Sequence, residues 1–313
     1  MPLASQPLKV LGTVENGEDV SAIVSTEQFL VVGADEGTSL QVLKRTAEGL
    51  KTGALIPLPV SKEADIEGLA IQRAPVDGRF TVFAIGCHCS ARKQPKKNTS
   101  ANENRQDLLD APKLKESRAH VYRLSLDATT GGVVGSVEQM SLSSFISTDK
   151  LLSHFLQIPS KENGIDIEGL ALGPDGKLFA GFRGPVLRGN FVPVLVFDFD
   201  DPNASELRFV NLDGFGIRDL AAVEGGFLIL AGPTGDGRFG APIFFWDGTD
   251  QIPGNDRASS PAKRLMEVTP PSGEAKAEGL AVLSENAQKY DVLIAFDSVA
   301  NGGLTRTTIP KKP

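Results

Sequence analysis

Four stretches of the chain carry nearly the same phrase: DIEGLAI at residues 65–71, DIEGLAL at 166–172, GIRDLAA at 216–222 and KAEGLAV at 276–282. A degenerate copy, EDVSAI, stands at 18–23. When Asp19, Glu67, Glu168, Arg218 and Glu278 are taken as equivalent positions, the intervals between them are 48, 101, 50 and 60 residues. Repeats of roughly 40–50 residues are typical of β-propeller blades, so the phrase predicts a propeller.

The segments that follow each copy repeat as well. A turn leads into an apolar run, a third β-rich run comes next, and four of the five copies have a fourth. Four strands per unit are typical of a propeller blade. The sequence therefore predicts an all-β, five-bladed propeller that forms one domain over residues 1–313. Its blades are expected at about 18–60, 65–142, 166–213, 217–269 and 277–309.

The long interval between the second and third copies could hold a sixth blade. However, residues 90–117 are polar and charged without an alternating strand, and residues 143–164 have apolar residues partly at helical spacing. We therefore predict a loop insertion and a helical insertion, both belonging to the second blade. The last copy supplies only three strands, and residues 8–14 contain a spare one. That N-terminal strand is expected to be the fourth strand of the last blade and to close the ring.

Composition excludes several classes of partner and suggests a compartment. The net charge is −7 and the pI is near 5.2, which argues against nucleic acid or an anionic membrane as partner. No stretch approaches the roughly 20 apolar residues of a membrane span, and no signal peptide is visible at the start. Cys87 and Cys89 are too close in sequence for an unstrained bridge on an extended strand. We interpret them as free thiols of a cytoplasmic protein.

The repeat predicts a polar rim at one end of the central channel. The first strand of each blade should line the channel, so the five equivalent residues should form a ring near the axis. The second strand runs antiparallel, and its end should bring Asp35, His88, Arg183, Pro233 and Asp297 to the same face. Asp65 and Asp166 stand two residues before the ring glutamates, and Arg188 lies in the loop after Arg183.

Three interpretations of this rim remain open. In the first, the arginines and backbone amides neutralise the carboxylates, and the rim is a structural belt of salt bridges. In the second, Asp19, Glu67, Glu168 and Glu278 bind Ca²⁺ or Mg²⁺, which prefer oxygen ligands. In the third, Arg183, Arg188 and Arg218, together with Glu278, Asp297 and Asp35, bind an anionic or polyhydroxylated ligand.

Catalysis would need an acid and a base at the rim. His88 is the candidate acid or base, with Glu67 or Glu168 as its partner or as a carboxylate pair. The run Cys87-His88-Cys89 suggests zinc, but no further ligand stands nearby at the usual spacing, so zinc is not predicted. The basic insertion that begins at Arg92 leaves directly from this strand and could act as a lid.

The ordered motifs resemble a known family. DIEGLA, FRGPV at 182–186, GIRDL at 216–220 and LAGPT at 230–234 are similar to those of a bacterial propeller family described as a domain of unknown function. This resemblance implies the propeller fold and no particular activity. Over one blade, Glu168–Pro185, the chain also resembles the esterase-like phytase propellers, which implies that Arg183 contacts a phosphate or an ester.

The sequence thus predicts a propeller that binds a small polar or anionic ligand at the channel mouth, with ester hydrolysis as a reaction such a site could perform. It requires no cofactor. The alternative is a non-catalytic scaffold whose rim charges are structural salt bridges and whose faces bind another protein. A ligand site predicts an open pocket at the rim, whereas the scaffold predicts paired and occluded side chains.

Overall fold

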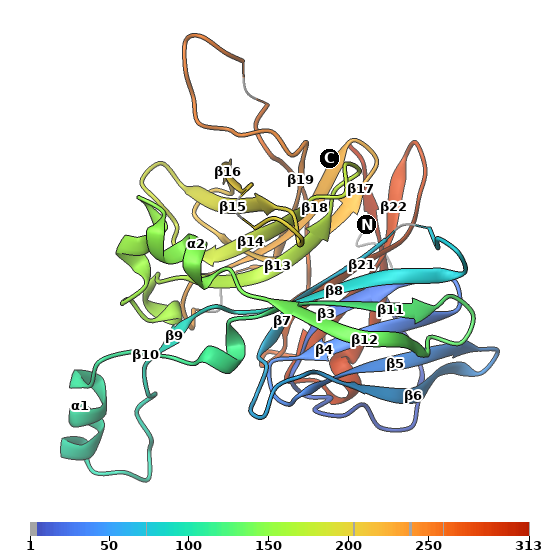
Figure 1. Ribbon diagram of the computed structural model, residues 1–313, viewed down its shortest axis with the longest axis horizontal. Coiled ribbons are helices and arrows are strands. Elements are labelled where there is room, and N and C mark those ends of the chain that lie inside the picture. The colour runs from blue at the N-terminus through green and yellow to red at the C-terminus, as the bar shows by residue number, and fades with distance from the viewer. Residues whose placement is uncertain (1–4, 73, 203, 238–239, 259, 313) are drawn as a thin grey trace.

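The computed structural model describes residues 5–72, 74–202, 204–237, 240–258 and 260–312, and it confirms a five-bladed β-propeller of four-stranded sheets (Figure 1). The first two blades consist of β3 (Val20–Ser25), β4 (Phe29–Ala34), β5 (Ser39–Thr46) and β6 (Gly49–Pro57), and of β7 (Ile66–Ile71), β8 (Arg79–Gly86), β11 (Val121–Asp127) and β12 (Val133–Met140).

The remaining blades follow in chain order. The third consists of β13 (Asp166–Leu172), β14 (Leu178–Gly184), β15 (Phe191–Phe197) and β16 (Glu206–Asn211). The fourth consists of β17 (Gly216–Val223), β18 (Gly226–Gly232), β19 (Pro242–Trp246) and β20 (Lys263–Glu267). The fifth consists of β21 (Lys276–Glu285), β22 (Lys289–Asp297), β23 (Thr305–Pro310) and β1 (Gln6–Pro7).

The repeated phrase forms the innermost strand of each blade. β3, β7, β13, β17 and β21 each contact the next in this order, and β21 contacts β3, so the five strands surround the axis. Glycine in the phrase permits this close approach. A Cβ on Gly68 would lie 2.8 Å from the Leu170 nitrogen, and one on Gly169 would lie 3.0 Å from the Leu220 nitrogen. Any larger side chain at these two positions would push neighbouring blades apart.

Each innermost strand has a bulge at the same place in the phrase. In β7 the register with β8 passes from Ile66 to Gly68 and leaves Glu67 unpaired. The same irregularity recurs in β3, β13, β17 and β21. A bulge re-aims the side chain of its extra residue. We call the bulged residue of each innermost strand the ring position.

Apolar side chains fill the space between blades. Between the third and fourth blades, Trp246 is fully buried, and its ring centroid lies 5.6 Å from that of Phe227 and 6.3 Å from that of Phe179. The Trp246 indole donates a hydrogen bond to the Thr249 carbonyl at 2.8 Å, so its polar edge is satisfied. Burial of such aromatic side chains supplies much of the stability between blades.

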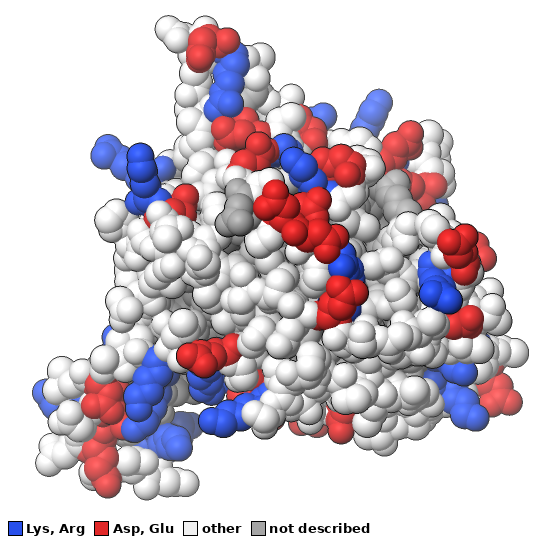
Figure 2. All heavy atoms as spheres, in the orientation of Figure 1, with Lys and Arg blue, Asp and Glu red and all other residues white. Residues whose placement is uncertain are grey.

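The insertion between β8 and β11, predicted as a loop, contains a helix, and the second insertion follows β12. The first contains β9 (Ser90–Ala91), α1 (Ala101–Leu109), β10 (Lys113–Leu114) and a 3₁₀ turn, Glu116–Arg118. Figure 1 shows α1 projecting from the body at the lower left, and in Figure 2 this projection carries Lys/Arg and Asp/Glu side chains next to one another. The second insertion contains α2 (Ser143–Thr148) and 3₁₀ turns at Leu152–Phe155 and Ser160–Glu162. Outside the insertions, a further 3₁₀ turn, Ala300–Gly303, precedes β23.

The N-terminal segment differs from the expected closing strand over 8–14. The two-residue β1 pairs with β23 in the last blade, where Gln6 lies opposite Arg306. β2 (Val10–Leu11) instead pairs in parallel with β6 of the first blade. Gly12, at φ 106°, follows β2 in a backbone conformation that favours glycine. The last blade is therefore completed by residues 6–7, ahead of the expected strand, while residues 10–11 of the expected strand join the first blade. None of the described helices has the length and apolarity that a bilayer crossing needs.

Candidate functional site

The ring position brings together four of the five residues expected from the repeat: Glu67, Glu168, Arg218 and Glu278. The first blade is different. There the register of β3 with β4 skips Ser21, so Ser21, and not Asp19, occupies the ring position. Ser21 is buried, and its hydroxyl donates to the Ile66 carbonyl of the next blade. Asp19 aligns instead with Asp65 and Asp166, two residues earlier in the phrase.

Arginines from the third and fourth blades join the ring carboxylates into a chain of buried ion pairs. The Arg183 guanidinium contacts Asp166 and also lies 2.7 Å from the Glu168 carboxylate. Arg218 bridges Glu168 at 3.1 Å and Glu278 at 2.8 Å. Each of the five residues in this chain of ion pairs is more than nine-tenths buried. We call Asp166, Glu168, Arg183, Arg218 and Glu278 the ion-pair belt.

The two arginines reach the belt from different strands. Arg183 comes from β14, the second strand of its blade, whereas Arg218 comes from β17, the first strand. The second-strand position of the fourth blade that corresponds to Arg183 is Gly232. A Cβ on Gly232 would lie 3.0 Å from the Arg218 Nε, so the Arg218 side chain occupies the space that a side chain at 232 would take.

Asp219 is a site residue that the sequence comparison missed. It stands where three other copies of the phrase have glycine, directly after the ring position. It is fully buried, and its carboxylate accepts hydrogen bonds from the Leu220 N–H at 2.7 Å and the Leu280 N–H at 2.6 Å. Burial raises the pKa of the Asp219 carboxyl. The hydrogen bonds from these two N–H groups and from the Leu170 N–H oppose this rise. Asp219 therefore ties together the innermost strands of the third, fourth and fifth blades.

A cavity of about 1020 Å³ lies over the ring positions. Its floor is made by Glu67, Glu168, Arg218 and Glu278, and its sides include Asp35 and Asp297 at the ends of second strands. Both insertions contribute to its wall, through residues such as Arg92 and Lys161. Its lining contains twelve acidic and seven basic side chains. The site is thus open, predominantly acidic, and built by all five blades.

Two partly buried carboxyl groups in this cavity, those of Asp35 and Glu67, lack a cationic partner among the described residues. Among the residues that the structure describes, neither Asp35 nor Glu67 has an ion pair, and Oδ1 of Asp35 is buried without a hydrogen bond. Burial, and then the neighbouring Glu278 and Asp65, raise the pKa of Asp35 to about 8. Burial, and then Glu168, Asp65, Asp166 and Glu278, hold the pKa of Glu67 well above its usual range. Both shifts are in the direction that favours the protonated carboxyl.

Arg118 links the first insertion to the cavity floor. It closes the 3₁₀ turn that ends this insertion and lies 3.1 Å from the Asp65 carboxylate and 2.6 Å from the Glu63 carboxylate. Burial raises the pKa of Asp65 to about 7, while Arg118 opposes this rise. The sequence offered no signal for Arg118, because it stands in an insertion that has no counterpart in the other blades.

Three candidate residues, Asp19, His88 and Arg188, do not line the cavity. His88 is buried, with Nδ1 2.9 Å from the Gly86 carbonyl and Nε2 accepting from the Leu142 N–H at 3.2 Å. Burial lowers its pKa to about 4, so this imidazole is a neutral structural group. The pairing of β7 with β8 places Cys87, one residue earlier, at the position equivalent to Arg183 and Asp297. Arg188 is exposed in its loop and does not line the cavity.

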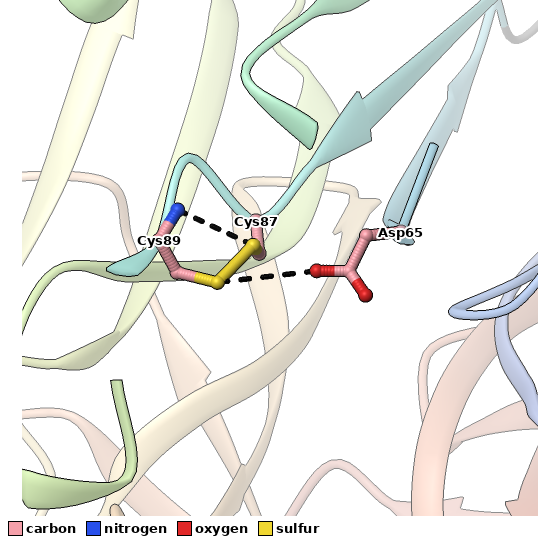
Figure 3. A group of neighbouring side chains, drawn as sticks. All are labelled: Asp65, Cys87 and Cys89. Carbon is pink, nitrogen blue, oxygen red and sulfur yellow. Dashed lines mark hydrogen bonds between the residues drawn. A yellow bond between two sulfur atoms is a disulfide. The ribbon is translucent and has the colours of Figure 1, made fainter. Parts of the chain in front are cut away.

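The expectation of free thiols is wrong, because Cys87 and Cys89 form a disulfide. The bridge is possible because the chain is not extended there. His88 has φ 51°, which brings the two Cα atoms to 5.1 Å, within the normal range for disulfides. Figure 3 shows this bridge with the Asp65 carboxylate beside it, where Cys89 Sγ and Asp65 Oδ2 are 3.9 Å apart.

The four carboxylates proposed for Ca²⁺ or Mg²⁺ do not form a compact ligand set. Asp19 lies outside the ring, and Glu168 and Glu278 are engaged by arginines. Within the described residues, the one group of three metal-ligating side chains whose donor atoms all lie within 4.8 Å of one another is Asp65, Cys87 and Cys89. A divalent cation at the ring would therefore have to displace ion pairs of the belt.

Comparisons with known proteins agree with the fold. A family model described as "Protein of unknown function (DUF3616)" matches residues 19–308. No curated protein matches the chain. Among solved structures, an exo-β-1,3-galactanase from Phanerochaete chrysosporium is similar with a TM-score of 0.50 and 7% identity, over 98% of this chain and 63% of the galactanase chain. This chain thus spans about three-fifths of that protein.

Two other solved structures are similar over most of both chains. They are glutaminyl cyclase from Myxococcus xanthus, with a TM-score of 0.45, 12% identity and coverage of 98% and 95%, and a PQQ-bound aldose sugar dehydrogenase from Streptomyces coelicolor, with a TM-score of 0.42, 12% identity and coverage of 98% for each chain. At such low identity, structural likeness leaves the chemistry to the residues of the site.

Proposed function

The chain belongs to the DUF3616 family of proteins of unknown function, and we propose that this member binds a small polar ligand in the cavity over the ring positions. Asp35 and Glu67 are the proposed contacts. The observation that carries the proposal is the contrast between these two carboxyls, which line the cavity without a cationic partner, and the ion-pair belt, in which each carboxylate contacts an arginine.

A buried carboxyl without a partner is costly, and natural proteins usually keep such groups where a ligand will satisfy them. Asp35 and Glu67 are half-buried residues without an ion-pair partner among the described residues, and Oδ1 of Asp35 is buried without a hydrogen bond. A ligand that donates hydrogen bonds or carries a positive charge would relieve the mutual repulsion that raises their pKa values. The cavity is large enough for a molecule of drug or sugar size.

The same charges favour a polyhydroxylated or amine-bearing ligand over an anionic one. Acidic side chains outnumber basic ones in the lining, twelve to seven. An anion that sought Arg183 or Arg218 would also have to compete with the carboxylates that lie 2.7 to 3.1 Å from them. Losing either partner of a buried ion pair is expensive. We therefore assign the arginines a supporting role and the carboxyls of Asp35 and Glu67 the role of ligand contacts.

Hydrolysis is a second candidate function, favoured by the different environments of two neighbouring ring glutamates. Burial raises the pKa values of both Glu67 and Glu168. Neighbouring carboxylates add to the rise at Glu67, whereas Arg183 and Arg218 oppose the rise at Glu168. Two carboxyl groups whose surroundings shift their pKa values differently are suited to the acid and base roles that cleavage of glycosides or esters requires.

The scaffold alternative accounts for the ion-pair belt and leaves the rest of the rim unexplained. Salt bridges explain why Arg183, Glu168 and Arg218 are buried together. They do not explain an open cavity or the unpaired Oδ1 of Asp35. Nε of Arg183 is also buried without a hydrogen bond among the described residues. A ligand or solvent in the cavity could form hydrogen bonds with these two groups. A purely structural belt gives no reason for polar groups without a partner.

A thermal-shift screen against polyols, amino sugars, sugar phosphates, inositol phosphates and divalent cations tests the proposal. Each stabilising compound is then titrated by calorimetry against wild type, Glu67→Gln, Asp35→Asn and the control Glu48→Gln, which changes an exposed carboxylate in a turn. We expect binding to weaken at least tenfold in the first two variants and not in the control. Equal affinity in all four proteins, or stabilisation by anions alone, would contradict it.

A further inference from the structure

At one edge of the cavity, a short turn places two sulfur atoms beside a carboxylate. Cys87 Sγ, Cys89 Sγ and a carboxylate oxygen of Asp65 all lie within 4.8 Å of one another (Figure 3). The two cysteines come from the end of β8, and Asp65 directly precedes β7 of the same blade. All three residues are buried, and both Asp65 and Cys89 line the cavity. The ligand contacts Asp35 and Glu67 are separate residues.

We propose that reduction of the Cys87–Cys89 disulfide converts this turn into a zinc site, with two thiolates and the Asp65 carboxylate as protein ligands. Zn²⁺ is bound by cysteine sulfur at about 2.3 Å and by carboxylate oxygen at about 2.0–2.2 Å, usually with four ligands in a tetrahedron. Two such bonds hold sulfur and oxygen about 3.5 Å apart. The observed 3.9 Å between Cys89 Sγ and Asp65 Oδ2 is close to this separation.

The turn is held in place by contacts that do not depend on the disulfide. The His88 imidazole is fixed at both nitrogens, by the Gly86 carbonyl and by the Leu142 N–H. The Cys89 N–H donates to Cys87 Sγ at 3.2 Å, a contact that favours a thiolate over a neutral thiol. Both sulfurs are therefore expected to keep facing Asp65 after reduction.

Arg118 supplies positive charge beside the proposed site. Two thiolates and one carboxylate around Zn²⁺ have a net charge of −1, and the Arg118 guanidinium, 3.1 Å from Asp65 Oδ2 and shared with Glu63, offsets part of it. Metal-ligating carboxylates are commonly held by such a second hydrogen-bond partner. Oδ2 of Asp65 is the oxygen that lies near both Cys89 Sγ and Arg118, and its two lone pairs allow it to accept from Arg118 while it binds the metal. The fourth position faces the cavity, as in zinc sites that bind water or substrate.

The site would be controlled by redox state. Reduction takes two electrons and two protons from a dithiol reductant, which becomes a disulfide, and leaves Cys87 and Cys89 as thiols. Binding of Zn²⁺ then displaces the two thiol protons. The oxidised form has no thiolate to offer and retains only the Asp65 carboxylate, so it should not hold the metal. Nothing in this proposal depends on the cavity ligand.

Cobalt serves as the spectroscopic probe. The full chain is reduced with a phosphine that does not bind metals, titrated with Co²⁺, and compared with the unreduced protein. We expect one Co²⁺ per chain with intense thiolate-to-cobalt absorption in the reduced form only, and its displacement by one equivalent of Zn²⁺. Asp65→Asn should weaken Co²⁺ binding at least tenfold, while Glu48→Gln should leave it unchanged.

Alkylation of the two thiols in reduced wild type provides a test that needs no substitution, in case Asp65→Asn fails to fold. It should abolish the absorption, as should Cys89→Ser. Absence of the thiolate band from the reduced protein would overturn the proposal. So would the same band in the alkylated protein, or equal Co²⁺ affinity in the oxidised and reduced forms.

Discussion

Arg183→Met should destabilise the protein by about 3–5 kcal/mol, because it removes one cation from two buried carboxylates. The Arg183 guanidinium contacts both Asp166 and Glu168, and all three residues are more than nine-tenths buried. Breaking a buried ion pair by removing one partner costs about this much. Unfolding entropy is about 2.1 cal/mol/K per residue, so for 313 residues the loss corresponds to a fall in Tm of about 5–8 °C.

Differential scanning calorimetry at pH 7, supported by urea unfolding, measures this change. Arg264→Met is the matched control, because the Arg264–Glu267 pair is nearly half exposed and such pairs contribute about 1 kcal/mol or less. Adding Asp166→Asn to Arg183→Met should restore part of the loss by removing one stranded charge. If Arg183→Met were no more destabilising than Arg264→Met, the ion-pair belt would not be structural and the assignment of roles at the rim would fail.

Three further outcomes follow from the same geometry. Glu67→Gln should leave Tm at pH 7 unchanged or raised, since it removes a carboxyl repelled by its neighbours; a drop of more than about 3 °C would mean that Glu67 has a structural partner. Asp35→Asn should stabilise the protein increasingly between about pH 4 and pH 8, by on the order of 2 kcal/mol at the upper end. The folded protein keeps a proton on Asp35 that the unfolded chain loses above about pH 4, so the free energy of unfolding of the wild type falls across this window. If urea titrations showed that Asp35→Asn changes the free energy of unfolding equally at pH 5 and pH 8, this prediction would be contradicted. Asp219→Ala should cost about 2–5 kcal/mol in urea unfolding because it strands the N–H groups of Leu220 and Leu280, and a cost below 1 kcal/mol would refute the bridging role.

The propeller was predictable because one backbone requirement recurs in every blade. The phrase places a bulged polar residue, a small residue and an apolar residue in order, and the close approach of neighbouring strands at Gly68 and Gly169 explains why the pattern persists. Four of the five ring residues could therefore be identified from spacing alone. The insertions were recognisable as well, because their composition breaks the pattern of strands.

The failures come from places where the register is not visible in the sequence. The first copy of the phrase lacks Gly-Leu, so nothing in it distinguished Ser21 from Asp19 as the bulged residue. The sequence comparison assigned His88 to the rim position that Cys87 occupies, because no particular residue type marks the end of β8. Its left-handed backbone also brought Cys87 and Cys89 together. Arg118 and Asp219 act through contacts between distant segments, which no single copy of the repeat can reveal.

The most direct test of the proposed ligand site is a carbon-13 NMR titration of the side-chain carboxyls, with Asp35→Asn and Glu67→Gln used to assign the two signals. We expect Asp35 to titrate near pH 8 and Glu67 well above its usual value of about 4.5, with both midpoints falling when a ligand occupies the cavity. Midpoints below pH 5 for both groups in the ligand-free protein would mean that these carboxyls already have partners, and the cavity would lose its proposed contacts.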